Sequence, residues 1–372
     1  MRRKWLKGAL WVLLTPIILF VILMILLYVP PVQNFIRKQA TAIASDATGM
    51  NISVERIDLR FPLNLLVRGV QVVQSENDAV DVQHPDTLLN LGSLNVRVQA
   101  WPLLQGRVEV DDITLQQVAV NSSTLLEGMH IKGTLGRFFL ESHGIDLKKE
   151  NAVLNSVELS NTHVQVILAD TAEAPKDTVE TALNWRIALH NLKLKNVSVD
   201  LQMPLDSMTL AANIGDASIE DANADLKRQF YGWRKFALTG TAVNYDSGTA
   251  APVEGFDASH IALRDIRIGI DSVMSCGRDM NAVIREFSMY DRSGLTVTSL
   301  TGRLFADSTL ICVPHLQLTT PHSEMNLTAQ TYWKLVDIPT TGRLSARFNA
   351  NIGKQDVLLF AGGLPETFKE AY

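Results

Sequence analysis

The sequence has little cysteine, few aromatic residues and no excess of basic charge. Its 372 residues include only two cysteines, Cys276 and Cys312, and 7% of them are aromatic. Two cysteines permit at most one intramolecular disulfide, so a fold stapled by disulfides is excluded, and we expect two separate buried thiols. Four basic residues lie within the first seven positions, and the remainder of the chain is clearly net acidic. This balance argues against nucleic acid as a partner.

Motifs for catalysis and for metal or nucleotide binding are also lacking. The chain has no G-x-S-x-G, no H-E-x-x-H, no G-x-x-x-x-G-K-[ST] and no G-x-G-x-x-G between a strand and a helix. Its eight histidines occur singly, without cysteines at the spacing of a zinc site. His163 and His190 fall on polar positions of predicted strands, where we expect them to face solvent. We therefore expect no enzyme, no cofactor and no metal.

One long apolar run stands out near the N-terminus. Gly8 to Val29 is an uncharged stretch of 22 residues, about 33 Å long as a helix, which is enough to cross a bilayer. A secretory signal has a shorter apolar region with a small-residue cleavage site directly behind it, whereas Pro30 and Pro31 follow here. We predict a retained anchor within residues 1–31. Basic residues precede the run and place the N-terminus in the cytoplasm: Arg2, Arg3, Lys4 and Lys7.

Residues 32–49 have the spacing of a short amphipathic helix that ends at Gly49. Its apolar positions are Val32, Phe35, Ile36, Ala40, Ile43, Ala44 and Ala47. Two placements are open for this helix. It lies on the bilayer surface, or it plugs the end of the domain that follows.

From residue 50 to residue 372 the apolar period is two, and turn residues punctuate it. This pattern predicts a mostly β domain of short, mainly antiparallel strands, with few helices to cover them. That this sheet is elongated and curled into an apolar groove is what the family resemblance described below implies.

An internal repeat runs through this domain, in which two apolar residues, a polar residue and two more apolar residues recur in one pattern. The four segments start at Ile113, Val157, Leu192 and Ile261, and their polar residues are Gln117, Asn161, Asn196 and Asp265. The parity of the apolar positions switches at the polar residue, which predicts a β-bulge or a corner there. Repetition at this spacing is typical of stacked arrays. The predicted groove residues are Ile113, Leu115, Val157, Leu159, Val164, Val166, Leu192, Leu194, Val199, Leu201, Ile261, Leu263, Ile268 and Ile270.

Three segments carry a resemblance to a known family. They are Gly49–Ile57, Phe61–Val70 and the stretch Val96–Ile113, which contains Trp101-Pro102-Leu103-Leu104 followed by Gly106. Together they resemble the N-terminal part of the AsmA-like superfamily, in particular its TamB-like (translocation and assembly module) branch in a Bacteroidota-type form. The resemblance implies an inner-membrane protein with a periplasmic β-groove that carries phospholipid between the two membranes. Alternatively, it implies assistance to outer-membrane protein assembly with an Omp85-type partner. Such proteins are usually far longer, so we expect a chain truncated at its C-terminus.

Other interpretations of the apolar sheet stay open at this point. An aliphatic sheet face must be buried against itself, a partner or lipid. The first alternative is a closed β-sandwich or barrel core with nothing inside. The second is a scaffold whose exposed strand edge pairs with client strands. A membrane-anchored enzyme ranks below the lipid-binding groove and below the scaffold.

Overall fold

The structure is a computed structural model that describes residues 30–60, 63–74, 87–99, 109–122, 128–146, 149–168, 184–337 and 343–360. It is mostly β and divides into two compact units, residues 1–119 and 120–372. The predicted anchor, Gly8 to Val29, lies outside the described residues. Among the described residues, no helix has the length and apolar character needed to cross a membrane.

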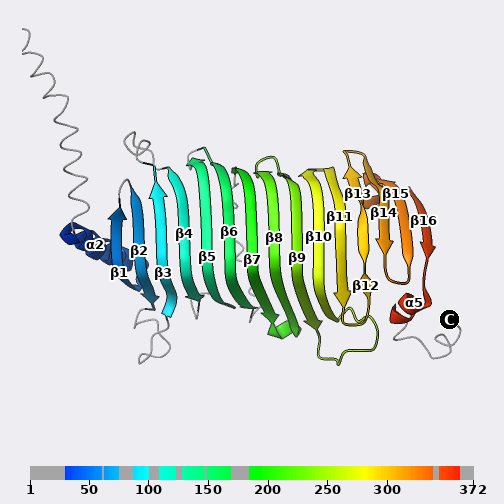
Figure 1. The fold of residues 1–372 in the computed structure, drawn as a ribbon, viewed down its shortest axis with the longest axis horizontal. Coiled ribbons are helices and arrows are strands. Elements are labelled where there is room, and N and C mark those ends of the chain that lie inside the picture. The colour runs from blue at the N-terminus through cyan, green and yellow to red at the C-terminus, as the bar shows by residue number, and fades with distance from the viewer. Residues whose placement is uncertain are drawn as a thin grey trace, which may run out of the picture. The chain divides into compact units, whose positions relative to one another are not determined.

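The described residues of the first unit form one helix and four strands in chain order (Figure 1). They are α2 (Pro30–Thr48), β1 (Asn51–Arg60), β2 (Asn64–Val73), β3 (Thr87–Val98) and β4 (Val110–Asn121). The predicted helix is confirmed, although it already begins at Pro30. Gly49 caps it in a left-handed conformation, φ +69°, and donates its N–H to the Ser45 carbonyl at 2.9 Å.

Helix α2 covers the outer edge of β1. The Gln33 side chain donates to the carbonyl of Leu59 at 3.2 Å, and Arg37 donates to the carbonyl of Glu55 at 2.6 Å. The N–H of Ile52 in turn donates to the Ser45 hydroxyl at 3.1 Å. An uncovered edge strand offers free backbone groups to other chains. Polar side chains of α2 occupy several of those groups in β1.

The second unit is an open, curled sheet whose strands follow one another in chain order, with β12 paired to β11 beside that path (Figure 1). Its strands are β5 (Met129–Asp146), β6 (Asn151–Leu168), β7 (Arg186–Met203), β8 (Met208–Asp225), β9 (Phe230–Ser247), β10 (His260–Cys276), β11 (Asp279–Asp291), β12 (Thr296–Val297), β13 (Ser299–Ala306), β14 (Leu310–Thr319), β15 (Glu324–Tyr332) and β16 (Leu344–Asn351). Its helices are η1 (Pro204–Asp206), α4 (Trp333–Asp337) and α5 (Lys354–Phe360).

The strand lengths differ from the prediction, whereas the mainly antiparallel pairing agrees with it. The strands are not short, since β5 to β9 each contain 18 residues. Strands β6 and β7 are parallel, whereas the pairs β5 and β6, β7 and β8, and β8 and β9 are antiparallel. A parallel pair needs a connection of roughly a dozen residues or more. The separation between Leu168 and Arg186 meets this requirement.

The sheet has hardly any closed core. Across the described residues only eight apolar side chains are buried, and none of the large ones is completely enclosed. They are Leu88, Leu91, Ala152, Val197, Ala217, Ile266, Val297 and Ala306. The described residues of the second unit form a single open sheet, so the closed-core alternative is wrong for them. Cys276 and Cys312 are separate free thiols, as predicted, but they are half-buried.

Helix α5 makes hydrogen bonds to two other segments of the second unit. The buried carboxylate of Asp356 in α5 accepts hydrogen bonds from the hydroxyls of Thr320 and Ser323, in the turn between β14 and β15. The carbonyl of Leu359 accepts the N–H of Phe256 at 2.8 Å. Helix α5 therefore links that turn to the segment between β9 and β10.

The segment before β10 is organised around one carboxylate. Asp257 accepts hydrogen bonds from the N–H groups of Val253, at 3.1 Å, and Ser259, at 2.9 Å. Its other contact is the His260 ring, with Nδ1 at 2.8 Å from Oδ2. These hydrogen bonds lower the pKa of Asp257 to about 2; the Val253 N–H has the largest effect, followed by His260 and then the Ser259 N–H. Burial acts in the opposite direction and raises the pKa.

Candidate functional site

The polar residue of the repeat is a left-handed kink in every predicted segment. The φ angles are +55° at Gln117, +52° at Asn161, +54° at Asn196 and +51° at Asp265. Asparagine and aspartate tolerate this conformation better than other residues with a side chain, because their short polar groups bond locally. The sequence position predicted as a bulge or corner is therefore a backbone turning point within a long strand.

The kinks of neighbouring strands lie opposite one another. Asn161 of β6 and Asn196 of β7 occupy the same level of the sheet, and the Asn196 amide donates to the Asn161 side-chain oxygen at 2.9 Å. Glycines of the adjacent strands lie opposite these two asparagines, Gly136 in β5 and Gly215 in β8. A Cβ at Gly136 would lie 2.8 Å from the Asn161 Cβ, and one at Gly215 would lie 2.7 Å from the Gly240 carbonyl oxygen. Only glycine fits this close approach of the strands.

The register is unbroken at the kinks of β6 and β7 but shifts around Asp265 of β10. Asn161 and Asn196 are therefore corners without an extra residue in the ladder, whereas Asp265 belongs to a bulge. The sequence had left both forms open.

Exposure changes phase at each kink. In β7, Lys193 and Lys195 are exposed, Asn196 after them is also exposed, and the next residue, Val197, is buried. Thr162 after Asn161 and Ile266 after Asp265 are buried in the same way. The alternation thus moves by one residue at the kink. Apolar residues before and after it consequently face the same side of the sheet.

The strand register aligns these residues into four apolar ladders across six strands, β5 to β10. Their members, in strand order, are Leu140, Val157, Leu192, Ile219, Phe236 and Ile270; Phe138, Leu159, Leu194, Ala217, Leu238 and Ile268; Gly133, Val164, Val199, Ala212, Val243 and Leu263; and Ile131, Val166, Leu201, Leu210, Tyr245 and Ile261. We call these side chains the apolar face. The kinks lie between the second and third ladders.

The structure brings together most of the predicted groove residues. All those in β6, β7 and β10 are members of the four ladders. They are half-buried, except Val199, which is exposed with 39% of its surface accessible. Ile113 and Leu115 are half-buried in β4, a strand of the first unit.

Sequence reasoning missed the contributions of β5, β8 and β9 to the apolar face. In β9 the repeat pattern is in fact present, with Phe236 and Leu238 before a left-handed Gly240, φ +61°, and Val243 after it. Glycine in place of the polar residue concealed this copy. In β8, alanines at ladder positions, such as Ala212 and Ala217, weakened the apolar signal.

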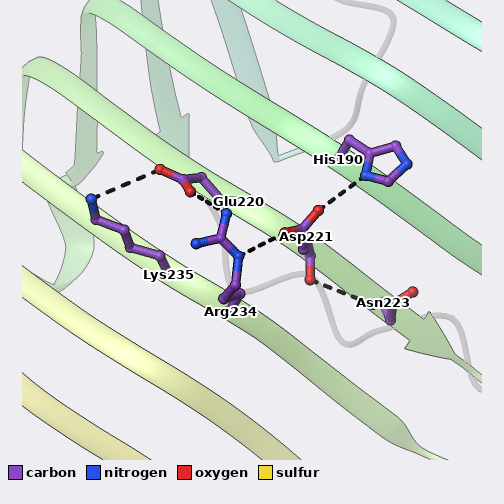
Figure 2. Close-up of polar contacts among 6 residues, drawn as sticks. All are labelled: His190, Glu220, Asp221, Asn223, Arg234 and Lys235. Atoms are coloured by element: carbon purple, nitrogen blue, oxygen red, sulfur yellow. Dashed lines mark hydrogen bonds and ion pairs between the residues drawn. The ribbon is translucent and has the colours of Figure 1, made fainter.

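The opposite side of the sheet, which we call the polar face, carries an ion-pair cluster at a second kink, Asp221 in β8, φ +51° (Figure 2). Asp221 accepts from Arg234 Nε at 2.7 Å and lies 3.0 Å from His190 Nδ1. Glu220 pairs with Arg234 and, at 3.8 Å, with Lys235. The Arg234 hydrogen bond, and then that of His190, lowers the pKa of Asp221, while Asp221 and Glu220 raise the pKa of Arg234.

This cluster has the character of a solvated contact between β7, β8 and β9. The His190 side chain is 69% exposed and that of His163 is 49% exposed, so both face solvent as predicted. Within the described part of the chain, no group of three or more potential metal ligands occurs. Exposed ion pairs of this kind contribute little to stability.

The apolar face is thus the feature with the clearest binding chemistry. It presents aliphatic and aromatic side chains on aligned ladders, and the described residues place no second layer over them. Such a surface binds hydrocarbon rather than polar or charged groups. Comparison of the sequence with protein-family models finds no matching family, and comparison with curated proteins finds no similar sequence.

Proposed function

We propose that the apolar face of β5–β10 binds the acyl chains of phospholipids, and that the protein carries them between the inner and outer membranes during envelope biogenesis. The observation that carries the proposal is the set of four aligned apolar ladders whose side chains stay half-exposed. Exposed apolar area costs about 25 cal/mol per Å² relative to burial, so a hydrocarbon partner is favoured.

The kinks make this face suitable for long, flexible chains. Without the change of phase at Asn161 and Asn196, Val164 and Val199 would point to the polar face. Only two of the four ladders would then remain on the apolar face. With it, both halves of the strand contribute to one surface. Charged side chains such as Lys193 and Lys195 stay on the polar face, so no ionic group interrupts the ladders.

The same proposal includes a location. Gly8 to Val29, with basic residues in front of it, acts as a single-pass inner-membrane anchor that leaves the bulk of the chain in the periplasm. The resemblance to the TamB-like branch of the AsmA-like superfamily supports both the location and the lipid cargo.

The test is mass spectrometry of lipids that co-purify with the full chain. We expect phospholipid with the natural protein and a marked loss with Leu194→Gln, which puts a polar amide in the second ladder. The matched control is Lys193→Gln, which changes the neighbouring residue on the polar face. Circular dichroism verifies that both variants are folded. Absence of lipid from the natural protein, or equal loss in both variants, contradicts the proposal.

A second function has an observation of its own. Strand β16 ends the sheet order, and each of its residues is exposed, including Leu344 at 61% and Phe348 at 58%. Such an edge accepts a further strand through its free backbone groups. We propose as the alternative a scaffold that assists outer-membrane protein insertion or secretion with an Omp85-type partner.

The edge function predicts strand-dependent capture of an unfolded outer-membrane protein. Replacing Ala350 or Ala346 in β16 with proline removes a backbone donor and constrains the strand, so capture is lost if the edge is used. Lipid binding at the apolar face of β5–β10 is retained in the same variants. Capture that persists in both proline variants contradicts the alternative.

A further inference from the structure

Helix α2 has two sides with different chemistry. The side that faces β1 is polar, because Gln33, Arg37 and Ser45 make the hydrogen bonds to that strand. Large apolar residues lie on the other side. Phe35 is 67% exposed and Ile43 is 59% exposed.

An ordinary surface helix buries its large apolar residues against its own domain, whereas Phe35 and Ile43 are exposed. They are two turns apart and about 80° around the helix from each other, so they belong to one broad side, and the exposed residues Gln39 and Asp46 lie between them around the helix. Among the described residues this outer side has no protein partner, because α2 packs on β1 with the side that carries Gln33 and Arg37.

The position of α2 in the chain identifies an occupant. The helix begins at Pro30, and the 22-residue apolar stretch ends at Val29, so no linker separates them. If that stretch spans the membrane, as the proposed function requires, α2 starts at the bilayer surface. A helix with exposed Phe and Ile at that depth lies in the interface with its apolar side in the acyl-chain boundary.

We infer that α2 is a bilayer-contacting helix, held between the edge of β1 on its polar side and the lipid surface on its apolar side. Lys38 and Asp46 are the exposed charged residues of α2, one of each sign. Electrostatic attraction to anionic headgroups therefore adds little, and insertion of Phe35 and Ile43 provides the contact. The inference rests on the proposed anchor but not on lipid binding by β5–β10.

The test compares neighbouring positions on the two sides of α2. In a Cys276→Ser, Cys312→Ser background of the full chain, single cysteines at Phe35→Cys, Ile43→Cys and Asn34→Cys carry an environment-sensitive fluorophore. Asn34 is exposed, next to Phe35, and on a different side of the helix. The protein is reconstituted into phosphatidylcholine and phosphatidylglycerol vesicles with nitroxide-labelled acyl chains.

We expect blue-shifted emission and strong quenching by the nitroxide lipid at positions 35 and 43, and neither at position 34. Equal quenching at all three positions, or none at 35 and 43, overturns the inference. Disulfide formation between copies through Phe35→Cys or Ile43→Cys also overturns it, because a second chain then occupies the apolar side. Carbonate extraction separates the two failures. A chain that resists extraction but shows no quenching at 35 and 43 keeps its anchor and loses only the helix contact.

Discussion

The backbone kink at Asn196 allows a prediction whose magnitude follows from its geometry. Asn196→Val places a β-branched residue at φ +54°, where an L side chain costs about 1–2 kcal/mol. The variant also loses the hydrogen bond to Asn161, 2.9 Å long, worth about 0.5–1 kcal/mol at an exposed site. We expect β7 to be destabilised by about 1.5–3 kcal/mol. Asn196→Gly is the matched control, because it loses the hydrogen bond without the steric cost.

Hydrogen exchange is the suitable assay because it reports on each strand separately in a chain of several units. Amides of β6, β7 and β8 should exchange roughly 10- to 150-fold faster in Asn196→Val, and much less than that in Asn196→Gly. Amides of β13–β16 serve as an internal reference that does not change. Natural exchange rates in the valine variant, or equal acceleration in the glycine variant, would refute the reasoning about the left-handed kink.

Three further predictions concern single residues of the second unit. Gly215→Ala should lower the thermal unfolding midpoint, because the added Cβ would lie 2.7 Å from a carbonyl oxygen. Gly269→Ala should leave the midpoint unchanged, because the atom nearest to its added Cβ is 3.6 Å away. Equal effects of the two substitutions would contradict this reasoning. Asp257→Asn should destabilise the segment 248–259 at pH 7. The pKa of this carboxylate is about 2 in the folded protein and ordinarily 3.8, so its contribution to stability is present above about pH 4 and is lost towards pH 2. The difference in stability between Asp257→Asn and the natural protein should therefore shrink as the pH falls over that range. A difference in stability that does not depend on pH would contradict the assignment. Asp356→Asn should weaken the two hydroxyl hydrogen bonds by about 1–3 kcal/mol and accelerate exchange in α5; unchanged exchange in α5 would contradict that role.

The sequence predicts the composition of the apolar face better than the lengths of its strands. The polar residue of the repeat marks the kinks correctly, because a change of apolar parity has few structural causes. The strand lengths do not follow from the sequence, because a bulge within one strand and a corner between two strands leave the same apolar pattern. Segments 157–159 and 164–166 belong to one strand, β6, which runs through both.

Pairing between strands could not be derived from the sequence. Apolar alternation is the same for parallel and antiparallel neighbours, so the parallel pairing of β6 and β7 had no signal in the repeat itself. The long interval between Leu168 and Arg186 was the only indication of a crossover. The ion-pair cluster of Asp221 and Arg234 was equally hidden, since it depends on which strands become neighbours.

Helix α2 shows the same limit in another form. The spacing of its apolar residues and Gly49 predicted the helix and its end. Which side faces the sheet could not be predicted, because hydrogen bonds from Gln33 and Arg37 to backbone carbonyls of β1 outweigh the usual preference for apolar packing there. The exposed Phe35 and Ile43 result from that choice.

Photo-crosslinking at adjacent residues of β7 tests the central claim most directly. Leu194 belongs to the second apolar ladder, opposite Ala217 of β8, and Lys193 is exposed on the polar face. A photoreactive amino acid in place of Leu194 should capture phospholipid in cells, and one in place of Lys193 should not. A second pair, Leu238 and Thr239 in β9, should behave in the same way. Lipid capture that is equal at 193 and 194, or absent at both 194 and 238, would contradict binding of acyl chains by the apolar face.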